Sequence, residues 1–168
     1  FTYIASVNAI KYTGAKPVFV DSDLNTWQID ATKIEDRITK NTKAILVVHL
    51  YGQPCEMDAI LSIAKKHKLY IVEDCAEAFG SLYKGKHVGS FGDVSTFSFF
   101  GNKTITTGEG GMVVTNDLTL HEKVVHLKGQ GLAKDREYYH DIVGYNYRMT
   151  NICAAIGCAQ LERANELI

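Results

Sequence analysis

The chain has 168 residues, of which 46% are hydrophobic and 22% charged, and its formal net charge is −1. This composition is that of a globular protein, and the length allows one domain with a substantial core. The near-neutral charge argues against a nucleic-acid or anionic-membrane surface, and no apolar run approaches the roughly 20 residues of a membrane span. We therefore expect no nucleic-acid or membrane partner.

The first third of the chain contains short apolar runs between helical patterns. We predict a helix over 4–14, a short strand over 16–23, and a helix over 30–38 with Asp30 as its N-cap. The continuous apolar run "TKAILVVHL" predicts a strand over 42–50 that is covered on both faces.

The remainder continues the alternation. An amphipathic helix is expected over 56–68 and a buried strand over 69–74, ending in Glu73 and Asp74. The segment "YKGKHVG" is typical of a hairpin turn with solvated lysines. Two further strands are expected over 93–100 and 111–117. Helices are expected over 118–129 and 150–168, with an irregular segment over 135–149 between them.

Alternating strands and helices predict an α/β domain with a mainly parallel sheet. In such sheets, ligands collect at the carboxyl ends of the strands. Asp74 and Lys103 each follow a predicted strand directly. We therefore expect both to belong to one site.

The glycine-rich turn "GNKTITTGEGG" leaves three roles open for Lys103: phosphate binding, pairing with a carboxylate, or action as an amine nucleophile. The G-x-x-x-x-G-K-[ST] spacing of a nucleotide-binding P-loop is absent. Glu77 lies one helical turn beyond Asp74, so both carboxylates can face one space. A lysine and an acid at strand ends suit pyridoxal phosphate, which needs an amine for its Schiff base and a carboxylate at its ring nitrogen.

Four separate motifs carry a resemblance to a known family. The stretches "AKPVFVDSD", "AILVVHLYGQPCEMDAI", "EDCAEAFGSLYKGKHVGSFGDVSTFSFFGNKTITTGEGGMVVTND" and "GYNYRMTNICAAIGCAQLE" occur in this order and span nearly the whole chain. They resemble the DegT/DnrJ/EryC1/StrS sugar aminotransferases, which are fold-type-I pyridoxal phosphate enzymes. The resemblance implies a three-layer α/β/α large domain like that of aspartate aminotransferase. Residues 1–168 would be its central part, with the N-terminal phosphate-binding strand and helix and the C-terminal small domain absent.

The resemblance also implies roles for individual residues. Lys103 would form the Schiff base, Asp74 would pair with the pyridinium nitrogen, and Ser98 would contact the cofactor phosphate. Glu77, where many relatives have Gln or His, would lie near the ring oxygen of pyridoxal 5'-phosphate. Tyr3 would stack on the ring.

Two residues are expected at a subunit interface. Asn146 would reach the partner's cofactor phosphate in a homodimer, and Arg148 would either assist it or form a structural ion pair. No metal is expected: none of the cysteines forms a C-x-x-C pair, and no histidine cluster accompanies them. We expect all of them to be reduced core residues of a cytoplasmic protein, at Cys55, Cys75, Cys153 and Cys158.

The implied reaction is a transamination. An amino group would pass from L-glutamate to C4 of a nucleotide-linked 4-keto-6-deoxy sugar, with GDP-4-keto-6-deoxymannose as the favoured substrate and GDP-perosamine as the product. The motif "SFFGNKTITTGEGGM" is most similar to enzymes that make this product. UDP or dTDP sugars, and a non-catalytic binding protein of the same fold, remain alternatives. Sugar dehydratases of the family carry His in place of Lys103, which argues against that chemistry.

Several other residues have simpler interpretations. His49 is expected to be a hydrogen-bonded core histidine, with lining of the site by His49 and Tyr51 as the alternative. The three phenylalanines around the end of the strand at 93–100 are expected in the core, at Phe97, Phe99 and Phe100. Asp21 and Asp23 are expected to cap a turn.

Overall fold

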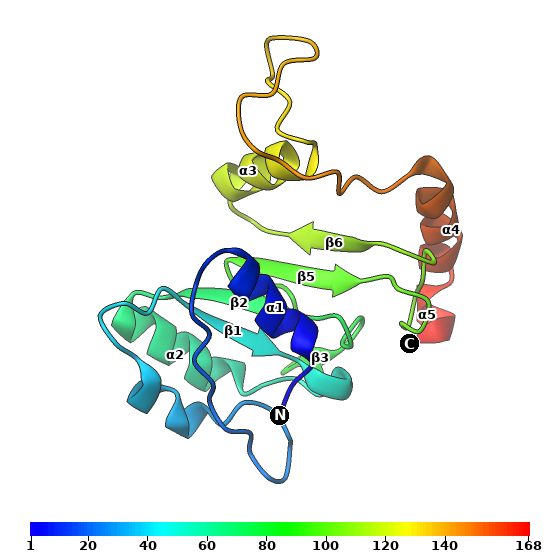
Figure 1. The fold of residues 1–168 in the computed structure, drawn as a ribbon. Coiled ribbons are helices and arrows are strands. Elements are labelled where there is room, and N and C mark those ends of the chain that lie inside the picture. Colours follow the sequence, from blue (N-terminus) through cyan, green and yellow to red (C-terminus); the bar gives the residue numbers. More distant parts are fainter.

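The computed structural model describes all of residues 1–168. Figure 1 shows a sheet flanked by helices, with one segment projecting from it. The helices are α1 Ile4–Tyr12, η1 Ala31–Lys33, η2 Glu35–Arg37, η3 Leu50–Gly52, α2 Met57–His67, α3 Leu118–Lys128, α4 Asn151–Glu162 and α5 Ala164–Leu167. The strands are β1 Ala44–Val48, β2 Tyr70–Asp74, β3 Leu82–Tyr83, β4 Lys86–His87, β5 Val94–Ser98 and β6 Gly111–Val114.

The main sheet has the strand order β1-β2-β5-β6. β1, β2 and β5 run parallel, whereas β6 runs antiparallel to β5. The carboxyl ends of the three parallel strands therefore lie at one edge, as the arrowheads in Figure 1 show. The expected mainly parallel sheet is confirmed, and the edge predicted to carry the site is formed.

Period-two alternation assigns the side chains of each strand to two faces of this sheet. Ile45 and Val47 of β1 lie on the same face as Ile71 and Glu73 of β2. The helix α2 covers this face with the apolar stripe that its spacing predicts, formed by Met57, Ile60 and Ala64. These residues make the continuous core of the protein.

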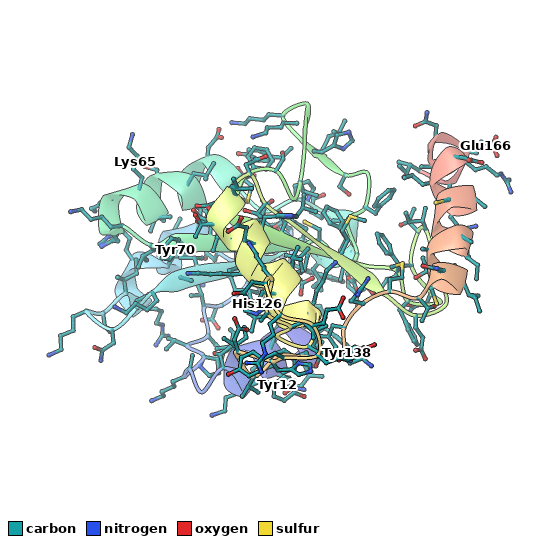
Figure 2. The ribbon with its side chains drawn as sticks, turned by 90° about the horizontal axis from the view of Figure 1, so that it is seen from above. Tyr12, Lys65, Tyr70, His126, Tyr138 and Glu166 are labelled. Atoms are coloured by element: carbon teal, nitrogen blue, oxygen red, sulfur yellow. The ribbon has the colours of Figure 1, made fainter.

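The opposite face of the sheet is covered by α1, and Figure 2 shows α1 and α2 on opposite sides. Ser6 of α1 contacts Asp74 at the end of β2. Leu46 and Val48 of β1 are partly buried on this face, so the predicted cover on both faces of the strand is only partial here. A hollow of about 720 Å³ separates part of this face from the segment 15–20.

The strand predicted over 16–23 is also wrong. Only an isolated bridge between Ser22 and Ile29 forms there, and Val18 and Phe19 are exposed. A strand needs a hydrogen-bonded neighbour, and the hollow lies between this segment and β1. The sequence pattern is that of a strand, but no partner lies within reach.

The helix predicted over 30–38 is replaced by the short 3₁₀ helices η1 and η2. The cap itself is confirmed, because the Asp30 carboxylate accepts a hydrogen bond from the Thr32 N–H at 3.0 Å. Ile38 is already extended, so the segment ends before a regular α-helix can form. Asp23 caps a turn as expected, accepting from the N–H groups of Asn25 and Thr26; the carboxylate of Asp21 makes no such bond.

The predicted hairpin at 83–89 is confirmed by the antiparallel pair β3–β4. Lys84 and Gly85 both have positive φ, as a two-residue hairpin turn requires. After β6, α3 leads into a mostly exposed segment over 129–150 that Figure 1 shows projecting from the sheet before α4. None of the helices combines the length and apolar character needed to cross a membrane.

Two expectations about the core need correction. Cys55 and Cys75 are buried as expected. Cys153 is only partly buried and Cys158 is exposed, since both lie on α4, which has no buried residue in this structure. All four are free thiols. Among the phenylalanines, Phe99 is buried and Phe97 packs on the core, whereas Phe100 is 58% exposed. Phe100 lies beyond the end of β5, where the backbone turns into the Lys103 loop.

Ile60→Ala tests the α2 face of the core. Ile60 is fully buried, so its truncation should lower the free energy of unfolding by about 2–5 kcal/mol through lost burial and a cavity. Denaturant unfolding of the intact protein measures this loss. The matched control is Leu24→Ala, at a side chain that is 90% exposed, which should change stability by less than about 0.5 kcal/mol. Equal effects at both positions would contradict the assigned core.

Candidate functional site at the strand ends

The strand register brings two of the predicted site residues to one face. Val48, Asp74 and Thr96 are neighbours across β1, β2 and β5, and Ser98 lies two residues beyond Thr96. Alternation therefore places Asp74 and Ser98 on the α1 face, at the carboxyl edge of the sheet. The Ser98 hydroxyl accepts a hydrogen bond from the Phe100 N–H at 3.3 Å, which holds it at the start of the lysine loop.

Two hydrogen bonds orient the Asp74 carboxylate. The Ser6 hydroxyl donates to one oxygen at 2.6 Å, and the Ala76 N–H donates to the other at 3.0 Å. Ser6 is itself buried in α1. The carboxylate at the end of β2 is thus fixed between a helix and the following turn, and is only partly exposed.

Lys103 lies in a loop that leaves β5 and returns as β6. The loop is closed at its base by the Phe99 N–H, which donates to the Gly110 carbonyl at 2.9 Å. The Thr106 N–H donates to the Gln160 side chain of α4 at 3.2 Å, which ties the loop to that helix. The expected glycine turn into β6 is confirmed, with positive φ at Gly108 and Gly110.

Glu77 links the turn after β2 to this loop. Its Oε1 lies 4.0 Å from the Lys103 Nζ, and the two side chains are 30% and 20% exposed. Its Oε2 accepts the Tyr51 N–H at 2.8 Å. No ion pair joins Lys103 to Asp74, so Glu77 is the carboxylate that the structure places against the amine.

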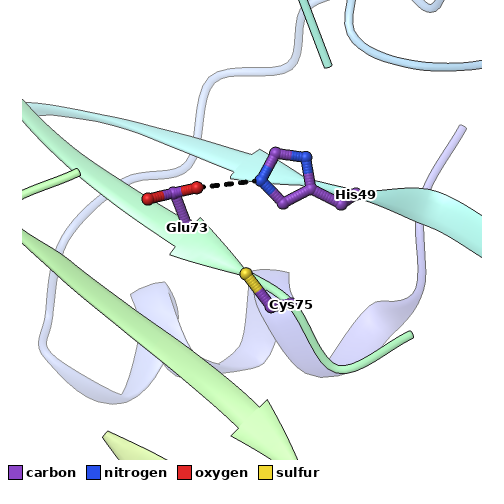
Figure 3. A group of neighbouring side chains, drawn as sticks. All are labelled: His49, Glu73 and Cys75. Carbon is purple, nitrogen blue, oxygen red and sulfur yellow. Dashed lines mark hydrogen bonds and ion pairs between the residues drawn. The ribbon is translucent and has the colours of Figure 1, made fainter. Parts of the chain in front are cut away.

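Behind this edge, on the α2 face, the Glu73 carboxylate is completely buried. It accepts hydrogen bonds from the N–H groups of Gly89, Phe91 and Gly92 at 2.6–2.8 Å, and it contacts the His49 Nε2 at 3.1 Å. Figure 3 shows His49, Glu73 and the neighbouring Cys75. Gly89 has φ +85°, and a Cβ there would collide with the Phe97 ring.

The His49 ring has a defined proton position. Its Nδ1 faces the Cys55 backbone N–H at 3.1 Å, which can only donate, so this nitrogen accepts and carries no proton. The ring proton is then on Nε2 and is donated to Glu73. His49 is thus a fully hydrogen-bonded core histidine, as predicted.

His49, Glu73 and Cys75 are close enough together to resemble a metal site. Both ring nitrogens of His49 and both oxygens of Glu73 are already engaged in hydrogen bonds. Burial, and then the charges of Glu73 and Asp74, raise the pKa of the Cys75 thiol, so it is not a thiolate ligand. The cluster is a structural network.

The other predicted site residues are not brought to Lys103 by any hydrogen bond or ion pair. Tyr3 precedes α1 and is exposed, about one helical turn before Ser6. Asn146 pairs with Gly129 just after α3, and both Asn146 and Arg148 are exposed. Their proposed contacts with a cofactor or a partner subunit stay predictions.

Two side chains of the site were not expected from the sequence: Ser6 binds Asp74, and Gln28 bonds to both backbone groups of Leu50. Tyr51 was named as a possible lining residue, but the bond from its backbone N–H to Glu77 was not expected. A helical serine and an isolated glutamine give no distinctive pattern. Tyr51 had one available signal, since a following Gly52 is typical of a turn.

The fold is an α/β domain with a candidate ligand site at the carboxyl edge of its sheet, and comparison with known proteins identifies its class. Residues 1–168 match the DegT/DnrJ/EryC1/StrS aminotransferase family. The solved structure of Helicobacter pylori PseC, an aminotransferase involved in the biosynthesis of pseudoaminic acid, has a TM-score of 0.94 and 37% identity. The matched region covers 98% of this chain and 45% of that chain.

The chain belongs to the DegT/DnrJ/EryC1/StrS aminotransferase family. It is 70% identical over 167 residues to the GDP-perosamine synthase of Escherichia coli O157:H7, covering 99% of this chain and 46% of that protein. The GDP-perosamine synthase of Caulobacter vibrioides is 60% identical over 165 residues, with 98% and 44% covered. The chain therefore spans less than half the length of these relatives. The predicted family and fold class are confirmed.

The family and its structural neighbours indicate pyridoxal 5'-phosphate as the cofactor. The residues present at the strand ends suit this group. They offer a primary amine at Lys103, an oriented carboxylate at Asp74 and a hydroxyl at Ser98 on the same face as Asp74. This donor set has the amine, anion and hydroxyl that such a cofactor requires.

Glu73→Gln tests the buried network. Burial raises the pKa of Glu73, but the hydrogen bonds from His49, Gly92, Gly89 and Phe91 outweigh this effect and hold the pKa below its ordinary 4.5. The substitution should lower the free energy of unfolding near pH 7 by about 2–4 kcal/mol, because an amide group cannot accept from all four donors.

The pH dependence of this effect has a defined sign. A lowered native-state pKa means that the Glu73 contribution is complete above the unfolded-state value and is lost as pH falls through the native-state value. The difference between wild type and Glu73→Gln should therefore shrink below about pH 4.5. Denaturant unfolding across this range measures it, with Glu162→Gln at an exposed position of α4 as control. A constant difference would contradict an ionised Glu73.

Proposed function

We propose that the intact protein is a pyridoxal phosphate-dependent aminotransferase that moves an amino group from L-glutamate to C4 of a nucleotide-linked 4-keto-6-deoxy sugar. The favoured substrate is GDP-4-keto-6-deoxymannose, which would yield GDP-perosamine. Support for the sugar comes from two relatives of high identity that are both named GDP-perosamine synthase. A role in lipopolysaccharide O-antigen biosynthesis in the cytoplasm would accord with such a product.

One observation carries the catalytic part of the proposal. Lys103 lies within 4.0 Å of Glu77, in the turn that begins with the oriented Asp74 carboxylate. An amine and a carboxylate thus meet at the carboxyl edge of the sheet, where α/β proteins bind their ligands, and Asp74 lies three residues before that carboxylate. Lys103 is the only lysine whose amine is paired with a carboxylate of this turn.

Each residue has a distinct role in the proposal. Lys103 would hold the cofactor covalently and, when its amine is free, would move a proton to and from the substrate carbon as general acid and base. Asp74, fixed by Ser6 and Ala76, holds a proton on the ring nitrogen. The bound cofactor supplies an electron-withdrawing ring that stabilises negative charge at the reacting carbon.

The remaining assignments concern binding and assembly. Ser98 would donate a hydrogen bond from its hydroxyl group to the cofactor phosphate, and Tyr3 would cover the ring with its flat side chain. Asn146, on the exposed segment after α3, serves the partner's site in a homodimer. Residues 1–168 form the central part of the large cofactor-binding domain in this proposal.

Lys103→Ala tests the covalent role. In the intact protein it should abolish the visible absorbance of the lysine-bound cofactor, and it should slow transamination by more than about a hundredfold, since both covalent binding and proton transfer are lost. Absorbance spectra with and without glutamate measure this. The control Lys40→Ala, at an exposed lysine without an ion pair, should behave as wild type. A borohydride-reducible adduct in Lys103→Ala would refute the assignment.

Asp74→Asn tests the ring-nitrogen role. Asparagine keeps the size of the side chain but removes its charge, so the cofactor should still bind while the glutamate half-reaction slows by roughly a hundredfold. Stopped-flow absorbance after mixing with glutamate measures the rate. Asp36→Asn, on the exposed surface of η2, is the control. Near-normal turnover in Asp74→Asn would mean that another residue holds the ring nitrogen.

A further inference from the structure

Glu77 is held in place by a turn with unusual backbone geometry. Tyr51 has φ 53° and ψ 29°, in the left-handed region that residues with a side chain rarely adopt. This conformation directs the Tyr51 N–H to the Glu77 Oε2 at 2.8 Å. The other carboxylate oxygen of Glu77 then faces the Lys103 amine at 4.0 Å.

The surroundings of the turn maintain this strained conformation. The buried Gln28 side chain accepts from the Leu50 N–H at 2.9 Å and donates to the Leu50 carbonyl at 3.1 Å. The Ser81 hydroxyl donates to the Gly52 carbonyl at 2.7 Å. Backbone strain of this kind persists only where several contacts fix it, and it is concentrated at functional sites.

The aromatic ring of Tyr51 adds a further restraint. It packs against Trp27 and Phe1, with ring centroids 6.4 and 6.5 Å apart. The backbone donor is thus fixed by contacts on both sides of the residue. Glu77 is thus held by a hydrogen bond that does not involve Lys103.

We propose that Glu77 is a positioning residue for the Lys103 amine. It holds the amine at the strand ends whenever Lys103 is not bonded to the cofactor. The ion pair restrains the direction of the lysine side chain, although the partial exposure of both groups weakens it. The inference rests on the proposed function, in which Lys103 is released during each half-reaction and must stay within reach of the substrate carbon.

The charge of Glu77 and its position can be separated by substitution. Glu77→Gln removes the charge but keeps an oxygen that accepts from the Tyr51 N–H. Glu77→Ala removes both. Glu109→Gln is the matched control, because Glu109 is an exposed carboxylate of the same loop as Lys103 and makes no ion pair with it.

The experiment measures the reactivity of Lys103 toward trace acetic anhydride in the cofactor-free intact protein at fixed neutral pH. Only the uncharged amine reacts, and mass spectrometry compares Lys103 with the exposed Lys11 as an internal reference. Glu77→Gln should raise the relative reactivity of Lys103 several-fold, because an amine that is no longer held against a carboxylate turns outward and meets the reagent more often. Glu109→Gln should leave it unchanged.

A second readout concerns the role in the reaction. In the loaded protein, Glu77→Gln should slow the glutamate half-reaction several-fold, because the released amine is less often held beside the substrate carbon. Unchanged labelling of Lys103 in Glu77→Gln would overturn the inference, and so would changed labelling with an unaltered half-reaction. A purely structural role would leave the labelling of this variant at the wild-type value.

Failure of the proposed function gives a different result. Added pyridoxal 5'-phosphate should protect Lys103 of the wild-type protein from labelling, because the amine becomes bonded. Absence of protection would refute Lys103 as the cofactor lysine, whatever the effect of Glu77. Protection combined with identical labelling of wild type and Glu77→Gln would refute only the positioning role.

Discussion

The strand-end edge depends on one buried charge. Glu73 has no contact with water, so its carboxylate must be met by donors from the protein, and these come from His49 after β1 and from the segment 89–92. The bonds fix β1, β2 and the chain before β5 relative to one another. Asp74 is the next residue, so the direction of its carboxylate follows from the same constraint.

The sheet separates structural from chemical groups by face. Glu73, Ser95 and Cys75 are buried toward α2, whereas Asp74 and Ser98 face α1. The structural acid is thereby kept away from the proposed cofactor, although the two carboxylates are adjacent in sequence. The less covered α1 face leaves room for a ligand beside a rigid layer, and reactive groups gain precision when the layer behind them is fixed.

Local patterns predicted most of the fold. The stripe of α2, the apolar runs of β1 and β2 and the glycine turn before β6 all depend on neighbours in sequence. The strand expected over 16–23 failed because pairing needs a neighbour that local pattern cannot supply. The strand-end positions of Asp74 and Lys103 were predicted from local pattern and are confirmed, whereas their chemical roles stay predictions. The bond from Tyr51 to Glu77 was not predicted, because a backbone donor has no side-chain signature and left-handed geometry at a non-glycine residue is set by tertiary contacts.

The adjacency of Glu73 and Asp74 also constrains how the protein can change over time. Inserting or deleting one residue within the five-residue strand β2 would exchange the two acids between faces. The Asp74 carboxylate would then enter the buried α2 face, and the Glu73 carboxylate would face the side proposed to bind the ligand. A loop such as the Lys84–Gly85 turn can change in length without moving these acids, whereas any change in the length of β2 would move both of them.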